Sequence, residues 1–306
     1  MKQSRIVSKQ TEGIVLALIG VLAFSITLPA TRFAVPELGA AFVGFGRGAT
    51  AGLLALATVL ALRIPVPERR HWPGLAIVSL GVTIGFPVLA AYALRSLPSS
   101  HSAVVVGLLP AATAVMAVLI VRERPRLTFW LASGAGVLAV LLFAAAEGAG
   151  RPQLPDLLLI VGTFSGAVGY AEGARLAREM SAFNVIVWAL VLCLPVLAVP
   201  TLYIVVHNAP HGNLAAWLCF AYIAAISQFL AFLPWYRGLV LAGVAHTSQL
   251  GLAQPVMTLA WSALFLHEHV SALTLAAALL VIGCAAATQW TRPPVAEQMT
   301  EVFAPD

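Results

Sequence analysis

Apolar residues occur along this chain in runs of about 20 residues, separated by short breaks rich in proline, glycine and charge. The hydrocarbon core of a bilayer is about 30 Å thick, and a helix of roughly 20 apolar residues crosses it. The runs therefore predict transmembrane helices. A window of about 19 residues places these spans at 13–33, 38–62, 73–94, 101–121, 127–147, 155–174, 183–206, 215–236, 246–266 and 272–290.

Composition agrees with a chain whose main solvent is lipid. Of the 306 residues, 60% are hydrophobic and only 9% are charged, whereas soluble domains carry about 25% charged residues. The fold class predicted is an all-α membrane protein with ten transmembrane helices. No metallopeptidase, hydrolase or phosphate-binding motif is found, and no metal or cofactor is expected. The scattered Lys and Arg residues form no basic face, so no nucleic acid is expected as a partner.

The distribution of basic residues predicts the orientation of the spans. Alternating the connections between two sides puts thirteen of the seventeen Lys and Arg residues on one side. Cytoplasmic loops carry the excess of Lys and Arg, so both termini are predicted to be cytoplasmic, which requires an even number of spans. The expected location is a bacterial inner membrane.

An internal repeat divides the chain into two units. Three uncommon residues recur at a constant offset of 145 positions: His101, Pro110 and Glu123 return as His246, Pro255 and Glu268. The predicted units are 1–150 and 151–292, followed by a cytoplasmic tail at 293–306. Each unit holds five spans, and five is odd, so the second unit must enter the membrane inverted. Inverted repeats are typical of secondary transporters.

These motifs resemble the EamA-type branch of the drug/metabolite transporter superfamily. The resemblance is carried by Leu109-Pro110 with Glu123-Arg124, and by Gln254-Pro255 with His267-Glu268-His269. It implies export or exchange of small solutes through a cavity between the two units. We therefore expect a secondary transporter that exports amino acids, including aromatic ones, by alternating access. The alternatives are a membrane-embedded enzyme or lipid-handling protein, and a channel-like scaffold; a monomer is plausible.

Arg47 is the most conspicuous charge inside a predicted span. It lies about nine residues, or roughly 14 Å, into the second span. An unpaired charge at that depth costs about 2.5 to more than 10 kcal/mol, so the side chain needs a cavity or a partner. Two interpretations are open: a structural clamp at a close helix crossing, or recognition of an anionic group of the cargo.

Glu172 is an acid within the sixth predicted span. A buried carboxyl can bind and release a proton, which makes Glu172 a candidate for coupling transport to a proton gradient. The other interpretation is an ion pair with Arg175 or Arg178 one turn further along the helix.

Polar residues in the later spans are candidates for the cavity lining, because uncharged amides can bind a cargo without the cost of burying a charge. The other interpretation is hydrogen bonding between helices. The predicted substrate-binding residues are Arg47, Tyr170, Gln228, His246, Gln249 and Gln254. Pro110 and Pro255 bend matching spans and are candidate hinges, although proline is common in membrane helices.

Overall fold

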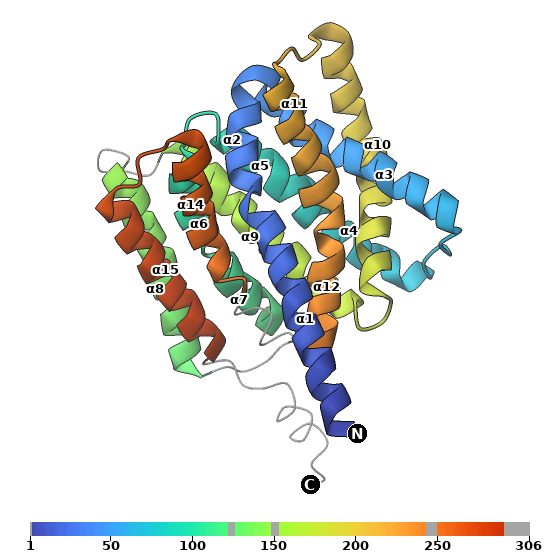
Figure 1. Ribbon diagram of the computed structural model, residues 1–306, viewed down its shortest axis with the longest axis horizontal. Helices are drawn as coiled ribbons and strands as arrows, with labels where there is room; N and C mark the ends of the chain where they lie inside the picture. The colour runs from blue at the N-terminus through green and yellow to red at the C-terminus, as the bar shows by residue number, and fades with distance from the viewer. Residues whose placement is uncertain (1, 122–125, 148–152, 243–249, 291–306) are drawn as a thin grey trace.

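The computed structural model describes residues 2–121, 126–147, 153–242 and 250–290, and these residues form helices and no strands (Figure 1). The α-helices of the first predicted unit are α1 (Lys2–Ser25), α2 (Thr27–Leu38), α3 (Arg47–Leu62), α4 (Trp72–Val78), α5 (Phe86–Ala93), α6 (Ser99–Val106), α7 (Leu109–Val121) and α8 (Leu127–Glu147). Those of the second unit are α9 (Leu154–Leu176), α10 (Ala182–His207), α11 (Leu214–Ala221), α12 (Phe232–Ala242), α14 (Ala253–Leu266) and α15 (Ala272–Trp290).

Eight helical segments of the described chain are long and apolar enough to cross a membrane, and they match the first eight predicted spans. They run over Thr11–Leu38, Phe42–Leu62, Arg69–Ala93, Ser99–Ile120, Leu127–Ala146, Leu154–Leu176, Ala182–His207 and Leu214–Gly238. The last two predicted spans coincide with the shorter apolar helices α14 and α15. The start of the ninth predicted span lies outside the described residues, so the total of ten spans stays a prediction.

The two units are interleaved and do not form separate bundles. Helix α1 packs along α12, α3 packs against α10, and α8 packs against α15. Span 1 of the first unit touches span 8 of the second through α1 and α12. The corresponding contact of the other two spans is that of span 6 with span 3, through α9 against α4 and α5. This exchange is the contact pattern that two repeated units related by a pseudo-two-fold axis would produce.

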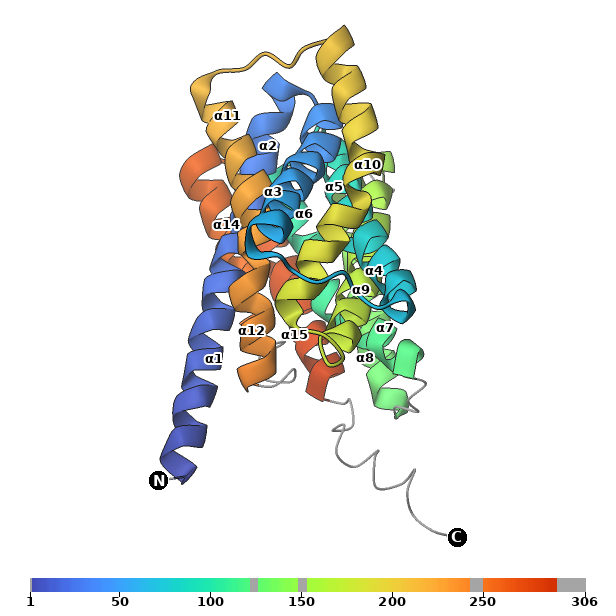
Figure 2. The ribbon, with the colours of Figure 1, turned by 90° about the vertical axis from the view of Figure 1, so that its right-hand side faces the viewer.

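Both ends of the described chain lie at the same end of the bundle. Figures 1 and 2 show α1 beginning, and α15 finishing, at the lower end of the molecule. An even number of crossings, as in the predicted ten spans, would give this arrangement, and the count of ten stays a prediction. Assignment of the lower end to the cytoplasm rests on the positive-inside rule.

Three spans contain π-helical stretches, in which the backbone hydrogen bonds skip one residue further than in an α-helix. They are Phe42–Gly46 in span 2, Ser79–Gly85 in span 3 and Tyr222–Leu230 in span 8. Pro87 and Pro234 follow the second and third stretches within four residues. Proline lacks the N–H that would continue the α-helical ladder, which favours such a change of register.

Span 1 is interrupted between α1 and α2. Pro29 has no N–H, so the carbonyl of Ser25 lacks the donor that a regular helix would supply. The hydroxyl of Thr258 on α14 donates to that carbonyl at 2.8 Å, and the indole N–H of Trp261 donates to Ser25 Oγ at 2.9 Å. Span 1 is thus bound to the second unit at its own break.

Replacing Thr258 by valine is expected to destabilise the protein by about 0.6 to 1.7 kcal/mol, the range measured for hydrogen bonds between membrane helices. The loss arises because the Ser25 carbonyl would keep no donor in a buried position. Thermal unfolding of the purified protein in detergent measures the change.

The matched control is Thr201→Val on α10. The Thr201 hydroxyl donates only to the Leu197 carbonyl of its own helix. If both variants lost the same stability, the contact between Thr258 and span 1 would contribute nothing beyond an ordinary threonine.

Candidate functional site

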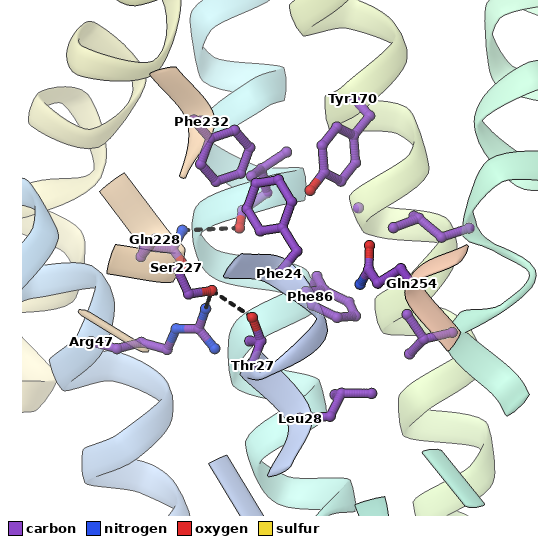
Figure 3. Close-up of a pocket in the computed structure, with 14 residues that line it drawn as sticks. Phe24, Thr27, Leu28, Arg47, Phe86, Tyr170, Ser227, Gln228, Phe232 and Gln254 are labelled. Carbon is purple, nitrogen blue, oxygen red and sulfur yellow. Dashed lines mark hydrogen bonds between the residues drawn. The ribbon is translucent and has the colours of Figure 1, made fainter. Parts of the chain in front are cut away.

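A cavity lies at the middle of the bundle between the two units (Figure 3). Its walls come from span 1, from the three spans with π-helical stretches, and from helices of spans 4, 6 and 9. The polar residues that line it are Thr27, Arg47, Tyr170, Ser227, Gln228 and Gln254. The aromatic residues Phe24, Phe86 and Phe232 line it as well.

Arg47 is the charged residue of this cavity. It is the first residue of α3, directly after the π-helical stretch Phe42–Gly46, and only 3% of its surface is exposed. Its one described hydrogen bond is a long one, from Nη2 to Ser227 Oγ at 3.5 Å, and its buried Nε has no partner. No Asp or Glu occurs among the described residues that line the cavity. The guanidinium therefore has donors left for an anion.

The hydroxyls beside Arg47 are already bound to each other. Ser227 Oγ and Thr27 Oγ1 lie 2.7 Å apart, which joins span 8 to the broken span 1 at the cavity wall. Gln228, the next residue, donates from Nε2 to the backbone carbonyl of Val82 at 3.2 Å. That carbonyl belongs to the π-helical stretch of span 3. Two of the three π-helical stretches thus meet at the cavity and supply part of its lining, as is common for such stretches at functional sites.

An aromatic wall faces the polar residues. The rings of Tyr170 and Phe232 are stacked with centroids 6.0 Å apart. Phe24 meets Phe232 edge to face at 4.9 Å. Aromatic pairs in these geometries are stabilising and offer flat apolar surface to a ring or an alkyl chain.

The cavity is narrow in this structure. Its empty volume is about 480 Å³, including its open mouth, but the space in which the centre of a water molecule fits is only about 30 Å³. That space holds about two water molecules. A metabolite would fit only after neighbouring helices separate.

The structure brings together four of the six predicted substrate-binding residues: Arg47, Tyr170, Gln228 and Gln254. The other two, His246 and Gln249, lie outside the described residues. Their roles in binding stay predictions. The lining also includes Thr27 and Ser227, which the sequence analysis did not single out. Small hydroxyl residues in apolar runs are too common to be informative alone.

Glu172 forms an ion pair with Arg175. Arg175 donates from Nη2 to Glu172 Oε1 at 2.6 Å and from Nε to Oε2 at 3.0 Å. A second carboxylate, Glu179, accepts from Arg175 Nη1 at 2.6 Å. This bidentate pair is one of the two arrangements expected from the sequence, and it occupies both carboxylate oxygens. The role of Glu172 in proton coupling stays a prediction, and Glu172 does not line the cavity.

The candidate hinges follow breaks in matching spans. Pro110 is the second residue of α7, after the turn at Gly107 and Leu108 that ends α6. Pro255 is the third residue of α14, also after a turn. Proline fits the first turn of a helix because its missing N–H would be unbonded there. The two prolines therefore begin helices, and their hinge role stays a prediction.

Comparison with known proteins decides the family. A model described as the EamA-like transporter family matches residues 11–145 and matches again at residues 153–288. The chain belongs to this family. It is also 41% identical over 282 residues to a protein named "Uncharacterized transporter YdeK" of Bacillus subtilis (strain 168), covering 92% of this chain and 98% of that protein. The predicted family is thereby confirmed.

A solved structure titled "Crystal structure of protein" has the same fold. It superposes with a TM-score of 0.59 over 91% of this chain and 96% of its own, at 17% sequence identity. At that identity the likeness bears on the fold alone. The family and the Bacillus relative identify the EamA-like chain as a multi-pass membrane transporter.

Proposed function

We propose that this EamA-like protein is a secondary transporter that exports amino acids, including aromatic ones, across a bacterial inner membrane by alternating access. The carrying observation is the unpaired guanidinium of Arg47 in a cavity between the two units. Hydrogen bonds between ionised partners are short and about twice as strong as neutral ones, so a carboxylate is the natural ligand. The export direction has its support in the resemblance to the family.

The rest of the cavity suits the remaining parts of such a cargo. The wall formed by Phe24, Tyr170 and Phe232 offers apolar and aromatic surface for a large side chain. The amide of Gln254 supplies an oxygen that can accept from an ammonium group without the cost of a buried carboxylate. An amphipathic zwitterion uses all three features.

Counterflow in reconstituted vesicles tests the proposal. Vesicles that contain the protein and are loaded with unlabelled phenylalanine are expected to take up labelled phenylalanine with saturable kinetics. Vesicles loaded in the same way but without the protein are not expected to take it up. Unlabelled competitors then remove one recognition element at a time: phenylpropionate lacks the amine, phenethylamine lacks the carboxylate and alanine lacks the ring. Phenethylamine is expected to compete worst because it has no group for Arg47.

Two results would contradict the proposal. Counterflow absent for a broad panel of amino acids would exclude this class of cargo. Equal competition by phenethylamine and phenylalanine would show that the carboxylate is not recognised, and the cargo would then be an amine or a neutral apolar molecule.

A further inference from the structure

A second cavity lies at the end of the bundle opposite the start of α1. The loops before α6, α9 and α15 all lie there, because each follows an odd number of the described and expected spans. Residues of these loops and of the first turns of the three helices line the cavity. The volume open to the centre of a water molecule is about 360 Å³ in this cavity and about 30 Å³ in the central cavity. This second cavity is therefore roomy enough to hold many water molecules.

A buried histidine and aspartate meet at its wall. His101 Nε2 on α6 and Asp156 Oδ1 on α9 are 2.7 Å apart, and their side chains are 8% and 2% exposed. Asp156 Oδ2 accepts from the backbone N–H of Gln153 at 2.8 Å. The phenyl ring of Phe143 lies against the imidazole with centroids 4.7 Å apart. The pair connects the first unit to the second.

The neighbouring carboxylate of Glu268 is also fully engaged. Its oxygens accept from the backbone N–H groups of Ser99 and Ser100 at 2.9 and 2.8 Å, and from the Ser99 hydroxyl at 3.1 Å. The carboxylate thus binds the first turn of α6, where the helix dipole favours a negative charge.

These contacts engage both carboxylates near the second cavity. Both oxygens of Asp156 and both oxygens of Glu268 already accept hydrogen bonds, and the described residues hold no group of three side chains able to bind a metal ion. When Asp156 is ionised it can only accept, and His101 Nε2 is then the donor of their hydrogen bond. The other ring nitrogen, Nδ1, has no partner among the described residues.

The charged and titratable groups around His101 come from several elements. Asp156 faces it from α9, and Glu268 and His269 lie in the loop between α14 and α15. Helix α8 contributes the ring of Phe143, and the α15 residue at the cavity is the uncharged Thr274. On α2, which also packs against α6, the charged side chains bind elsewhere: Arg32 to the carbonyls of Leu94 and Arg95, and Glu37 to Asn213. No Lys or Arg occurs among the described lining residues.

We propose that the second cavity is a proton-binding site, in which His101, held by Asp156, takes up a proton from water on that side of the membrane and thereby controls transport. The positive-inside orientation makes this the outer side. The control of transport rests on the proposed function, whereas the binding of the proton does not.

The two cavities share their supporting helices. Val106, at the end of α6, lines the central cavity five residues after His101, a rise of about 8 Å along a helix. Gly166 and Tyr170 line the central cavity further along α9 from Asp156. Charging His101 strengthens its attraction to Asp156 and so tightens the link between α6 and α9. The His101–Asp156 pair therefore joins two helices, α6 and α9, that also form walls of the central cavity.

The first experiment measures proton binding without any cargo. The ring signals of ¹³C-labelled histidines are followed by NMR in the purified full chain between about pH 5 and 8, the range in which histidine changes charge. The signal that is missing in His101→Gln identifies His101, and it is expected to shift with pH. A His101 signal that stays constant over this range would overturn the proposal.

The second experiment measures flux of labelled phenylalanine while only the outer pH is varied. The wild-type flux is expected to change several-fold, and the flux of His101→Gln, whose amide can still donate to Asp156, is expected not to follow pH. His71→Gln is the matched control: His71 lies 3.2 Å from Glu179 and belongs to the helical turn that precedes span 3, at the other end of the bundle. This variant is expected to keep the response to outer pH.

The outcomes separate the two proposals. If no amino acid is transported but His101 titrates, the proposed cargo is wrong and the proton site stands. If flux is measured and His101→Gln follows outer pH as the wild type does, control by His101 is wrong. Size-exclusion profiles and thermal unfolding establish that each variant is folded, and Asp156→Asn is a second variant with nearly unchanged shape that is expected to lose the response.

Discussion

Replacing Arg47 by methionine is expected to weaken amino-acid binding at least about tenfold without destabilising the protein. Arg47 is 3% exposed, its Nε has no partner, and its one described hydrogen bond is 3.5 Å long. Methionine has a similar length and no charge to desolvate, so the unfolding temperature should be unchanged or higher. Loss of hydrogen bonds to a carboxylate, about 1.5 to 3 kcal/mol each, predicts a binding constant weaker by at least about tenfold.

Arg32→Gln is the matched control for removing an arginine from a membrane helix. Arg32 donates to the carbonyls of Leu94 and Arg95 and does not line the cavity. This variant is expected to lose stability, because it leaves two carbonyls without their charged donor, while affinity for phenylalanine changes little. The two arginines should therefore show opposite patterns in counterflow and in thermal unfolding.

The same pair of measurements decides between the two interpretations of Arg47. A structural clamp would unfold more easily when Arg47 is replaced, and affinity would fall only as far as the fold does. If Arg47→Met is stable but has lost its affinity for phenylalanine, the guanidinium serves to bind a ligand and not to hold the helices together. A destabilised Arg47→Met with normal affinity would therefore exclude cargo recognition.

The spans were predictable because a single physical quantity determines them. The thickness of the hydrocarbon core sets the length of each apolar run, and a break such as Arg122 to Arg126 has no place in lipid. The break in span 1 was harder to foresee. Pro29 predicts a bend, but the exact end of α1 at Ser25 depends on donors from Thr258 and Trp261, more than 200 residues away.

The candidate site was predictable only where a polar residue is unusual in its surroundings. Arg47 and Gln228 are conspicuous because lipid-exposed positions exclude them, and both line the cavity. Phe24 and Phe232 line it too, but a phenylalanine in an apolar run looks the same whether it faces lipid, another helix or a cavity. Asp156 was overlooked because it lies near a predicted span end, where charge is ordinary, although the fold buries it against His101.

The π-helical stretches could not be placed from sequence at all. Their prolines mark spans 3 and 8, but span 2 has no proline near Phe42–Gly46. The stretch in span 3 also packs its backbone closely on α9 of the other unit, a contact that its own sequence does not specify. This packing is tightest at Gly81, within the π-helical stretch of span 3.

Replacing Gly81 by alanine is expected to be the most disruptive single-methyl change in the described bundle core. An added Cβ would lie 2.5 Å from the Ser165 carbonyl oxygen and 2.8 Å from the Gly169 amide nitrogen. Both contacts are with the backbone of α9, which cannot rotate away as a flexible side chain can. Overpacking of this kind costs about 1 to 3 kcal/mol, measurable as a lower unfolding temperature.

Transport should fall along with stability, because the neighbours of this contact line the central cavity. Val82 follows Gly81, and Tyr170 follows Gly169, so spans 3 and 6 cannot separate without moving both walls. Gly134→Ala on α8 is the control, since a Cβ there would meet nothing within 4 Å. Alanine is a better helix former than glycine by up to about 1 kcal/mol, so this variant should be unchanged or slightly more stable. If Gly81→Ala behaved like Gly134→Ala, the two units would not be in backbone contact at this crossing, and the cavity walls that depend on it would have to be placed differently.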